Sequence, residues 1–164
     1  TFPSERMIEM AKKLYYLAYG SNLNVRQMRY RCPGAKPIGI SVIPDYELLY
    51  KGSKTGAYLT IEPKKNSIVP VAVWEVTADD EKRLDAYEGC PTFYYKRDIR
   101  LTVKLVNGKN KRLDAFIYIM HEERKHGIPS LTYIRTCEEG YRNFGFDTKF
   151  LDAAYETSAK EVQR

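Results

Sequence analysis

A succession of short, strand-like segments separated by turn-forming residues constrains the fold of this chain more than any other feature. The segments that follow one another in the first half of the chain are 38–43, 46–50, 57–61 and 69–76. Pro44-Asp45 and the stretch 51–56 separate them. Short strands at nearly regular spacing are typical of an antiparallel sheet that curls toward a barrel.

Two further strands are predicted over 94–106 and 113–120. Asn107-Gly108 lies between them, and this dipeptide is the strongest short signal for a hairpin. Successive residues of a strand point to opposite faces of the sheet. Within 69–76 one of the two faces is more fully apolar, so we expect this strand to be half-buried.

Capping patterns predict helices between the strands. A buried strand over 14–19 ends at Gly20. Asn24, with Gln27 three residues later, favours a short helix, which must end by Cys32 because Pro and Gly follow.

Thr77 with Asp80 is a second capping pattern and predicts a helix over 78–87, with Leu84 and Tyr87 on its inner face. Toward the end of the chain, Ser130 or Thr132 could cap one helix and Asp147 another. We expect the tail after Thr157 to be frayed.

The composition fits one domain without a membrane segment. The 164 residues are 43% hydrophobic and 13% aromatic, which is enough apolar surface for one core. No run of 18 apolar residues could span a membrane, and no signal sequence opens the chain. We predict a single domain over 1–164 with its core at about 14–155, and we interpret residues 1–6, before Met7, as a remnant foreign to the native protein.

The net charge of +6 comes from Lys and Arg residues scattered among Asp and Glu. The densest basic runs, Lys64-Lys65 and 109–112, lie beside Asn and Gly and are interpreted as solvated hairpin loops. We therefore expect neither nucleic-acid nor membrane binding.

The cysteines and histidines predict neither a disulfide framework nor a metal site. Cys32, Cys90 and Cys137 are odd in number and widely spaced, which favours free thiols in a reducing, cytoplasmic location. His121 and His126 are five residues apart, unlike the two-histidine zinc helix, and we expect them to face solvent. Cys90 has no recognisable base beside it, so we expect a pocket-wall residue, not a nucleophile.

Gly20-Ser21-Asn22 stands where the first strand gives way to the first helix. Such a turn can direct successive backbone N–H groups at one point, and the helix N-terminus adds partial positive charge. The motif therefore fits either a cradle for a carboxylate or phosphate, or a plain strand-to-helix turn capped by Ser21 or Asn22.

Glu88 lies at the C-terminal end of its predicted helix, where partial negative charge disfavours an anionic side chain. Shielding by Tyr87, Tyr94 and Tyr95 would act in the same direction through desolvation. Both effects raise the pKa, and a carboxyl group of that kind can accept and return a proton near neutral pH. The alternative is a solvent-facing glutamate at a helix end.

The two motifs together resemble the gamma-glutamylcyclotransferase family and its plant-type AIG2-like relatives. The residues that carry the resemblance are Tyr19-Gly20-Ser21-Asn22-Leu23 and, mid-chain, Leu84-Asp85-x-x-Glu88-Gly89-x-Pro91-x-x-Tyr94. It extends over about 14–155 and implies an α+β fold, a small mixed, mostly antiparallel β-barrel with flanking helices. The strand pattern agrees with that fold.

The resemblance also implies roles for individual residues. Glu88 corresponds to the catalytic acid/base, and the backbone of the first motif corresponds to the part that holds the substrate. The residues of that motif are Tyr19, Gly20, Ser21, Asn22 and Leu23. A pocket tyrosine is expected soon after the glutamate, where Tyr94 and Tyr95 are equally suited, and Tyr133 is similar to a further pocket tyrosine.

The implied activity is release of 5-oxoproline and an amine or amino acid from a small gamma-glutamyl compound, a transferase or lyase reaction of glutathione metabolism that needs no cofactor and no metal. Two alternatives stay open: a related cyclotransferase with a different gamma-glutamyl donor, and a non-catalytic protein that binds a small molecule with the same fold. Retention of both Glu88 and the Gly20-Ser21-Asn22 turn argues against the second.

Overall fold

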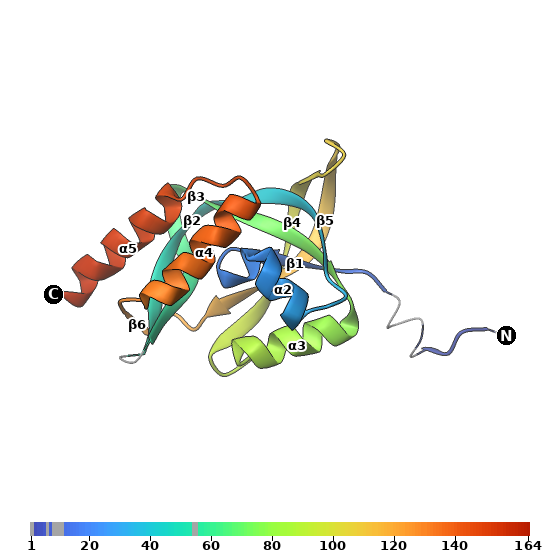
Figure 1. Ribbon diagram of the computed structural model, residues 1–164, viewed down its shortest axis with the longest axis horizontal. Coiled ribbons are helices and arrows are strands. Elements are labelled where there is room, and N and C mark those ends of the chain that lie inside the picture. Colours follow the sequence, from blue (N-terminus) through green and yellow to red (C-terminus); the bar gives the residue numbers. More distant parts are fainter. Residues whose placement is uncertain (1, 6, 8–11, 54–55) are drawn as a thin grey trace.

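The protein folds as a β-barrel with helices packed around it, as the computed structural model in Figure 1 shows. The structure describes residues 2–5, 7, 12–53 and 56–164. The strands in this part of the chain are β1 (Leu14–Ala18), β2 (Lys36–Ser53), β3 (Gly56–Val76), β4 (Tyr94–Leu105), β5 (Asn110–Met120) and β6 (Lys125–His126). The helical elements are the 3-10 turn η1 (Ser21–Leu23) and the α-helices α2 (Val25–Arg31), α3 (Ala78–Glu88), α4 (Leu131–Asn143) and α5 (Lys149–Val162).

The sheet closes on itself. Its strands lie in the order β3-β1-β5-β4-β2, and β2 pairs again with β3. β1 and β5 are parallel, with Tyr16 opposite Phe116, whereas the other pairs of the barrel are antiparallel. The short strand β6 adds to the edge of β2. The predicted fold class, a small mixed and mostly antiparallel barrel with flanking helices, is confirmed.

Four of the predicted strand segments merge into two long strands. β2 contains both 38–43 and 46–50, and β3 contains both 57–61 and 69–76. The register shifts between Pro44 and Tyr46, where Asp45 has a positive φ of 59°. The predicted turn at Pro44-Asp45 is therefore a bulge, which bends a strand without ending it. The tip of the predicted turn over 51–56 includes residues 54–55, which lie outside the described residues, as do residues 1 and 6 of the segment 1–6.

Of the two basic runs predicted to be hairpin loops, Lys64-Lys65 and 109–112, most residues lie in strands. Lys64 and Lys65 are exposed but belong to β3, so their placement in a hairpin loop is wrong. The hairpin at Asn107-Gly108 is confirmed, since β4 and β5 pair from Lys104 and Asn110 onward. Lys109 lies in its turn, whereas the exposed residues 111–112 belong to β5.

The strand segment 69–76 is buried on both faces and not on one. Val73 is fully buried, and Trp74, which points the other way, is nearly as buried. The ring of Trp74 packs edge-on against Phe144, just after α4, at 5.9 Å between centroids. The half-buried strand was a wrong expectation, because one face turns into the barrel and the other is covered by the C-terminal segment.

The N-cap residue before α2 and the capping box before α3 are confirmed. Asn24 Oδ1 accepts a hydrogen bond from Gln27 N at the start of α2. Thr77 and Asp80 form a reciprocal capping box at the start of α3. These caps fix where both helices begin, and thereby where their last turns lie beside the barrel.

The inner face of α3 was predicted only half correctly. Leu84 is fully buried, but Tyr87 is 47% exposed. The guanidinium of Arg31, the last residue of α2, lies 3.5 Å from the centre of the Tyr87 ring. Tyr87 therefore packs against α2 at the surface and does not enter the core.

The C-terminal segment is more ordered than its sequence predicts. Ser130, not Thr132, caps α4, and its Oγ accepts a hydrogen bond from Tyr133 N. Thr148 is the N-cap residue of α5, which continues to Val162. Ser158 is fully buried, and its Oγ accepts a hydrogen bond from Tyr50 N. The expected fraying after Thr157 is wrong, because Ser158 attaches the helix to β2.

The two histidines also make contacts instead of simply facing solvent. His126 Nδ1 lies 3.1 Å from Ser158 Oγ, and His121 Nε2 lies 2.7 Å from the carbonyl oxygen of Pro91. Both histidines are partly buried. They connect β6 to α5 and the segment after β5 to the segment after α3.

Helix α4 packs directly on the turn that follows β1. A Cβ atom added to Gly140 would lie 2.6 Å from Asn24 N and 2.7 Å from the Leu23 carbonyl carbon. Only glycine permits this approach, because the obstructing atoms belong to the backbone. Asn24 Nδ2 also donates to the Thr136 carbonyl oxygen at 3.1 Å. The turn η1 is therefore held between the barrel and α4.

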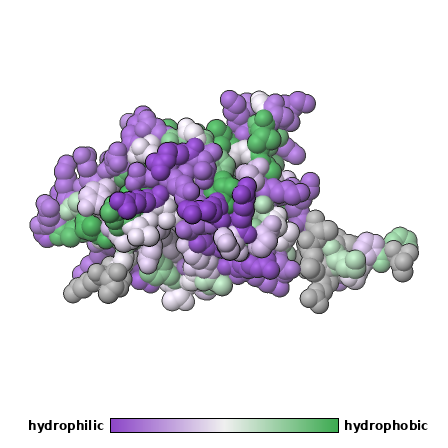
Figure 2. Space-filling view, viewed as in Figure 1, coloured by the Kyte–Doolittle hydropathy of each residue, from purple (hydrophilic) through white to green (hydrophobic). Residues whose placement is uncertain are grey.

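Figure 2 shows a face that is mostly hydrophilic, with hydrophobic residues in separate small groups. Within the residues that the structure describes, no helix is long and apolar enough to cross a membrane.

Candidate active site

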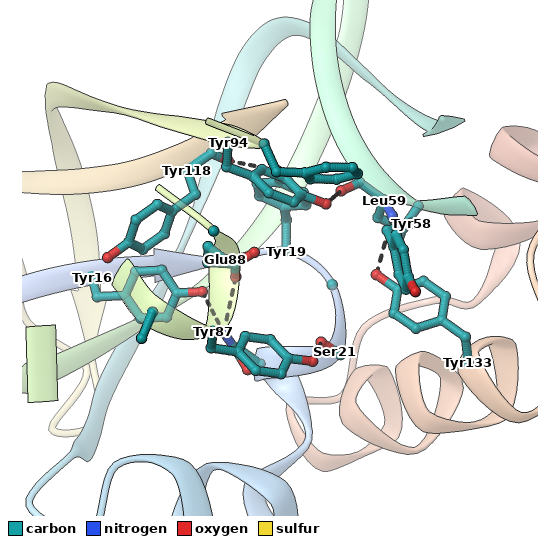
Figure 3. Close-up of a pocket in the computed structure, with 15 residues that line it drawn as sticks. Tyr16, Tyr19, Ser21, Tyr58, Leu59, Tyr87, Glu88, Tyr94, Tyr118 and Tyr133 are labelled. Carbon is teal, nitrogen blue, oxygen red and sulfur yellow. Dashed lines mark hydrogen bonds between the residues drawn. The ribbon is translucent and has the colours of Figure 1, made fainter. Parts of the chain in front are cut away.

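A pocket of about 360 Å³ opens between the end of β1, the turn η1, the last turn of α3 and the start of α4. The strands β3, β4 and β5 also contribute residues to its lining. Figure 3 shows its lining. The predicted site residues that line it are Tyr19, Gly20, Ser21, Asn22, Glu88, Tyr94 and Tyr133. Leu23 and Tyr95 were also predicted as site residues, but they do not line it.

The structure brings Glu88 and the Gly20-Ser21-Asn22 turn together. Glu88 is the last residue of α3, and Asn22 belongs to η1. Asn22 Nδ2 donates a hydrogen bond to Glu88 Oε1 at 3.3 Å. The two sequence motifs, 66 residues apart, therefore form one site.

Burial raises the pKa of the Glu88 carboxyl from its ordinary value of 4.5 to about 7, and the nearby Arg31 guanidinium opposes this shift. The direction agrees with the prediction from sequence. Of the three tyrosines predicted to shield it, Tyr87 and Tyr94 line the pocket. Tyr95 does not, and its hydroxyl donates to Glu122 outside the pocket. A carboxyl with this pKa changes its protonation near neutral pH, as a general acid/base must.

Asn22 links Glu88 to a cation. Arg31 Nη1 donates to Asn22 Oδ1, which orients the amide so that its Nδ2 points into the pocket. That Nδ2 donates to Tyr16 OH at 2.9 Å as well as to Glu88. Arg31 Nη2 also donates to Gln27 Oε1, one helical turn earlier, at 3.2 Å. The guanidinium is thereby fixed from two sides.

Sequence reasoning missed Arg31 and Tyr16. The helical spacing of Gln27 and Arg31 shows only that they share a face of α2. No local pattern indicates that this face meets Asn22. Tyr16 was recognised only as an aromatic residue of a buried strand.

The turn η1 offers backbone donors, but fewer than predicted. Leu23 N–H donates to the Gly20 carbonyl oxygen at 3.0 Å, and the Leu23 side chain is fully buried. Leu23 therefore supports the turn from inside. The N–H groups of Ser21 and Asn22 come before this first internal hydrogen bond, and such leading N–H groups have no partner within their own turn. These two are suited to an anion in the pocket.

The opposite wall of the pocket is aromatic, and main-chain hydrogen bonds hold its phenol groups. Tyr94 OH donates to the Leu59 carbonyl oxygen at 2.8 Å, and Tyr133 OH accepts from Leu59 N at 3.1 Å. Tyr58 and Phe93, which the sequence did not indicate, complete this wall. Only the fold brings the three segments 58–59, 93–94 and 133 together.

The structure distinguishes Tyr94 from Tyr95, which the sequence could not. Neighbouring residues of β4 point to opposite faces, so one tyrosine enters the pocket and the other leaves it. Tyr95 packs on His121, with ring centres 5.2 Å apart. Cys90 does not line the pocket either, so its expected place in the wall is wrong. Burial raises the pKa of its thiol.

Within the described residues, no group of three or more His, Cys, Asp or Glu side chains could hold a metal ion.

The comparisons with known proteins agree with this fold. The family model described as gamma-glutamyl cyclotransferase, AIG2-like, matches residues 16–135. A comparison with curated protein sequences found none that matches this chain.

Several solved structures share the fold. A gamma-glutamyl cyclotransferase superposes with a TM-score of 0.73 and 22% identity, over 87% of this chain and 86% of its own. An uncharacterized protein, loc79017 from Homo sapiens, gives 0.71 and 23% over the same shares. A gamma-glutamyl cyclotransferase from yeast, described as specific to glutathione, gives 0.61 and 12% over 91% of this chain and 96% of its own. At these identities the likeness is one of fold.

The family match includes the strand, the turn and the helix end that build the pocket, together with most of the chain. The chain belongs to the gamma-glutamyl cyclotransferase, AIG2-like family.

Proposed function

We propose that this protein is a gamma-glutamyl cyclotransferase that releases 5-oxoproline and an amine or amino acid from a small gamma-glutamyl compound. The observation that carries the proposal is the Glu88 carboxyl. It faces a pocket, lies within hydrogen-bond distance of Asn22 and has a pKa of about 7. A structural carboxylate has no need of that combination.

The reaction suits these groups. A gamma-glutamyl amide carries its nucleophile, the α-amine, and its electrophile, the γ-carbonyl, in one molecule, so proximity is built into the substrate. In its ionised form Glu88 accepts a proton from the α-ammonium group. The neutral amine then attacks the γ-carbonyl carbon and closes a five-membered ring.

The second half of the reaction returns the proton. As the tetrahedral intermediate collapses, the bond between the γ-carbon and the leaving nitrogen breaks, and Glu88 donates its proton to that nitrogen. The regenerated carboxylate then takes the second proton from the ring nitrogen, which becomes the lactam N–H, and passes it to the released amine, which leaves as an ammonium ion. Two protons thus move from the α-ammonium group to the leaving nitrogen, and Glu88 ends as a carboxylate. A pKa of about 7 serves both steps, because neither protonation state is strongly disfavoured near neutral pH.

The turn η1 would hold the other end of the gamma-glutamyl group. The N–H groups of Ser21 and Asn22 suit the substrate α-carboxylate, and backbone donors of the same turn suit the oxyanion of the intermediate. The scheme uses no metal, nucleotide or covalent nucleophile. A cytoplasmic location remains a prediction from the sequence.

The test is release of 5-oxoproline from a panel of gamma-glutamyl amino acids, gamma-glutamyl amines and glutathione. Glutathione belongs in the panel because one structural neighbour is described as specific to it. We expect release by the wild type and a loss of at least about 100-fold in Glu88→Gln, the usual range for an acid/base residue. Glu123→Gln, at an exposed position, is the matched control.

Two results would contradict the proposal. Undiminished release by Glu88→Gln would exclude Glu88 as the acid/base. Binding of gamma-glutamyl compounds without release from any of them would favour the non-catalytic alternative. Circular dichroism of each variant checks that the fold is retained.

A further inference from the structure

The pocket has a second end, away from Glu88, that the proposed chemistry does not explain. We call Tyr58, Leu59, Phe93 and Tyr133 the aromatic end. In Figure 3, Tyr58 and Tyr133 lie across the pocket from Glu88 and Tyr16. The Tyr58 ring meets Tyr133 edge-to-face at 5.2 Å and Phe93 at 6.2 Å, measured between centroids. These rings support one another and form a continuous apolar surface.

The polar atoms of this wall are largely occupied. Leu59 N donates to Tyr133 OH, and the Leu59 carbonyl oxygen accepts from Tyr94 OH. A ligand at the aromatic end therefore meets ring surfaces and the Leu59 side chain more than main-chain donors and acceptors. Such a surface favours apolar groups, by about 25 cal/mol for each Å² of apolar area removed from water.

The charges around the aromatic end disfavour a cation. Among the described residues that line the pocket, Glu88 is the only charged one, and it lies at the other end. Behind the wall, the Arg124 guanidinium stacks on the Phe93 ring, 3.9 Å from its centre. Arg124 Nε is buried and has no hydrogen-bond partner within the described part of the chain. A second cation would meet this positive charge, and the described residues that line this end of the pocket include no carboxylate.

We propose that the aromatic end binds the leaving half of the donor and selects amines with an uncharged, apolar substituent over amines with a second positive charge. The inference rests on the proposed function, because Glu88 and η1 then bind the gamma-glutamyl half and direct the other half toward Tyr58, Phe93 and Tyr133. Among the described lining residues, a charged ammonium group there gains only ring faces as partners, and the Arg124 guanidinium already stacks on Phe93, so the ammonium group loses more hydration than it regains.

An isosteric pair of donors tests this selection. Gamma-glutamyl pentylamide and gamma-glutamyl 4-aminobutylamide differ only in the last heavy atom of the tail, a methyl group against an ammonium group. We expect the wild type to have a kcat/KM at least about tenfold higher for the pentylamide, equivalent to about 1.4 kcal/mol. Equal values, or a preference for the aminobutylamide, would overturn the inference.

Direct binding separates this inference from the proposed function. Calorimetry of both donors with Glu88→Gln measures selection without turnover. Tighter binding of the pentylamide supports the aromatic end even if the wild type releases no 5-oxoproline, in which case the proposed function alone fails. Equal binding, or no detectable binding of the pentylamide, overturns the inference even if the wild type is active on other donors.

Tyr58 offers a way to reverse the selection. Its side chain is 44% exposed at the rim, so a polar replacement need not disturb the core. Tyr58→Glu would place a carboxylate at the aromatic end, and Tyr58→Gln is the matched uncharged control. We expect the preference for the pentylamide to fall at least about tenfold more in Tyr58→Glu than in Tyr58→Gln. Equal changes in the two variants would show that the tail does not reach this end.

Discussion

The two ends of the pocket are both built around tyrosines, yet they differ in what the hydroxyl groups contact. At the end that holds Glu88, Tyr16 OH accepts a hydrogen bond from Asn22, whose amide also donates to Glu88. At the aromatic end Tyr133 hydrogen-bonds to the main chain of Leu59, and so does Tyr94, which lies between the two ends. The first arrangement places a phenol beside a proton carrier, and the second leaves ring surfaces for the ligand. The partner of the hydroxyl, more than the residue type, decides what each tyrosine does.

The supports of the two ends also differ. Glu88 and Asn22 stand on short elements, the last turn of α3 and the turn η1 beneath α4. Tyr58 and Leu59 stand on β3, which pairs with β2 along nearly its whole length. The end that holds Glu88, which we call the polar end, should therefore be more sensitive than the aromatic end to small changes in packing. The following variants test that difference, from the largest expected effect to the smallest.

The largest effect concerns stability at Glu88. Burial raises its folded-state pKa above the ordinary 4.5, to about 7. The stabilisation that this shift provides is fully present below the unfolded-state pKa, and it is lost as the pH rises through about 7. Glu88→Gln has no proton to lose. Relative to the wild type, the free energy of unfolding of the variant should therefore rise by up to about 3 kcal/mol as the pH rises from about 4 to about 8.

Urea unfolding of both proteins across this pH range measures the difference between their free energies of unfolding, with Glu123→Gln as the exposed control. If the difference in the free energy of unfolding between wild type and Glu88→Gln did not change with pH, Glu88 would have the same pKa in the folded and the unfolded protein. The polar end would then lack the property on which its proposed chemistry depends.

The next effect concerns the support of η1. In Gly140→Ala the new methyl group would lie 2.6 Å from Asn24 N and 2.7 Å from Leu23 Cβ, so α4 must move away from the turn. We expect a loss of about 1–3 kcal/mol in the free energy of unfolding and a lower kcat/KM, since η1 carries Asn22. Thermal unfolding and 5-oxoproline release measure the two effects. Arg135→Ala, exposed on the same helix, should change stability by less than about 0.5 kcal/mol, and an equal loss there would refute the packing argument.

A smaller effect is expected from Arg31→Met. The Arg31 guanidinium lowers the pKa of Glu88, so its removal should raise that pKa further above the ordinary value. Because the reaction begins with ionised Glu88, the rising limb of kcat/KM against pH should move to higher pH. The pH-dependent part of the loss should be about tenfold or less near pH 7 and absent by about pH 9. Any loss that persists at high pH reflects the freed Asn22 amide.

Arg31→Lys is the control, because it keeps the charge and removes the planar fork. The rising limb of kcat/KM against pH should stay close to that of the wild type in this variant. The tyrosines around Glu88, Tyr16 and Tyr94 among them, have pKa values raised well above 10 and stay neutral throughout. If the rising limb of kcat/KM against pH did not move in Arg31→Met, the Arg31 guanidinium would act only by positioning Asn22.

Local features of the fold, such as turns and helix caps, could be predicted more readily than features that depend on how distant segments pack together. The Asn107-Gly108 hairpin and the caps at Asn24 and Thr77 were predicted correctly, because each depends on neighbours in sequence. The bulge at Pro44-Asp45 was mistaken for a turn, since proline and aspartate mark both. Ser158 was assigned to a frayed tail, because only the packing of α5 on β2 buries it.

The same division holds for the site. Glu88 and the Gly20-Ser21-Asn22 turn carry local signals and a family resemblance, and the pocket contains both. Arg31, Tyr58 and Phe93 carry neither, because their places depend on how distant elements meet. Leu23 belongs to the right motif, but its side chain faces the core.

The smallest effects compare two neighbouring tyrosines. Tyr94→Phe removes the donor to the Leu59 carbonyl oxygen, a buried bond, and should cost about 1 kcal/mol of stability. It should also raise KM for the pentylamide modestly while kcat stays close to its wild-type value, because the ring remains. Tyr95→Phe removes only a contact with the exposed Glu122, so stability should change by less than about 0.5 kcal/mol and the kinetics should not change. Urea unfolding and steady-state kinetics on both variants decide the matter. A fall in kcat with Tyr94→Phe would give its hydroxyl a part in the chemistry and remove the contrast between the two ends, whereas equal kinetic losses in both variants would show that Tyr95, too, reaches the substrate.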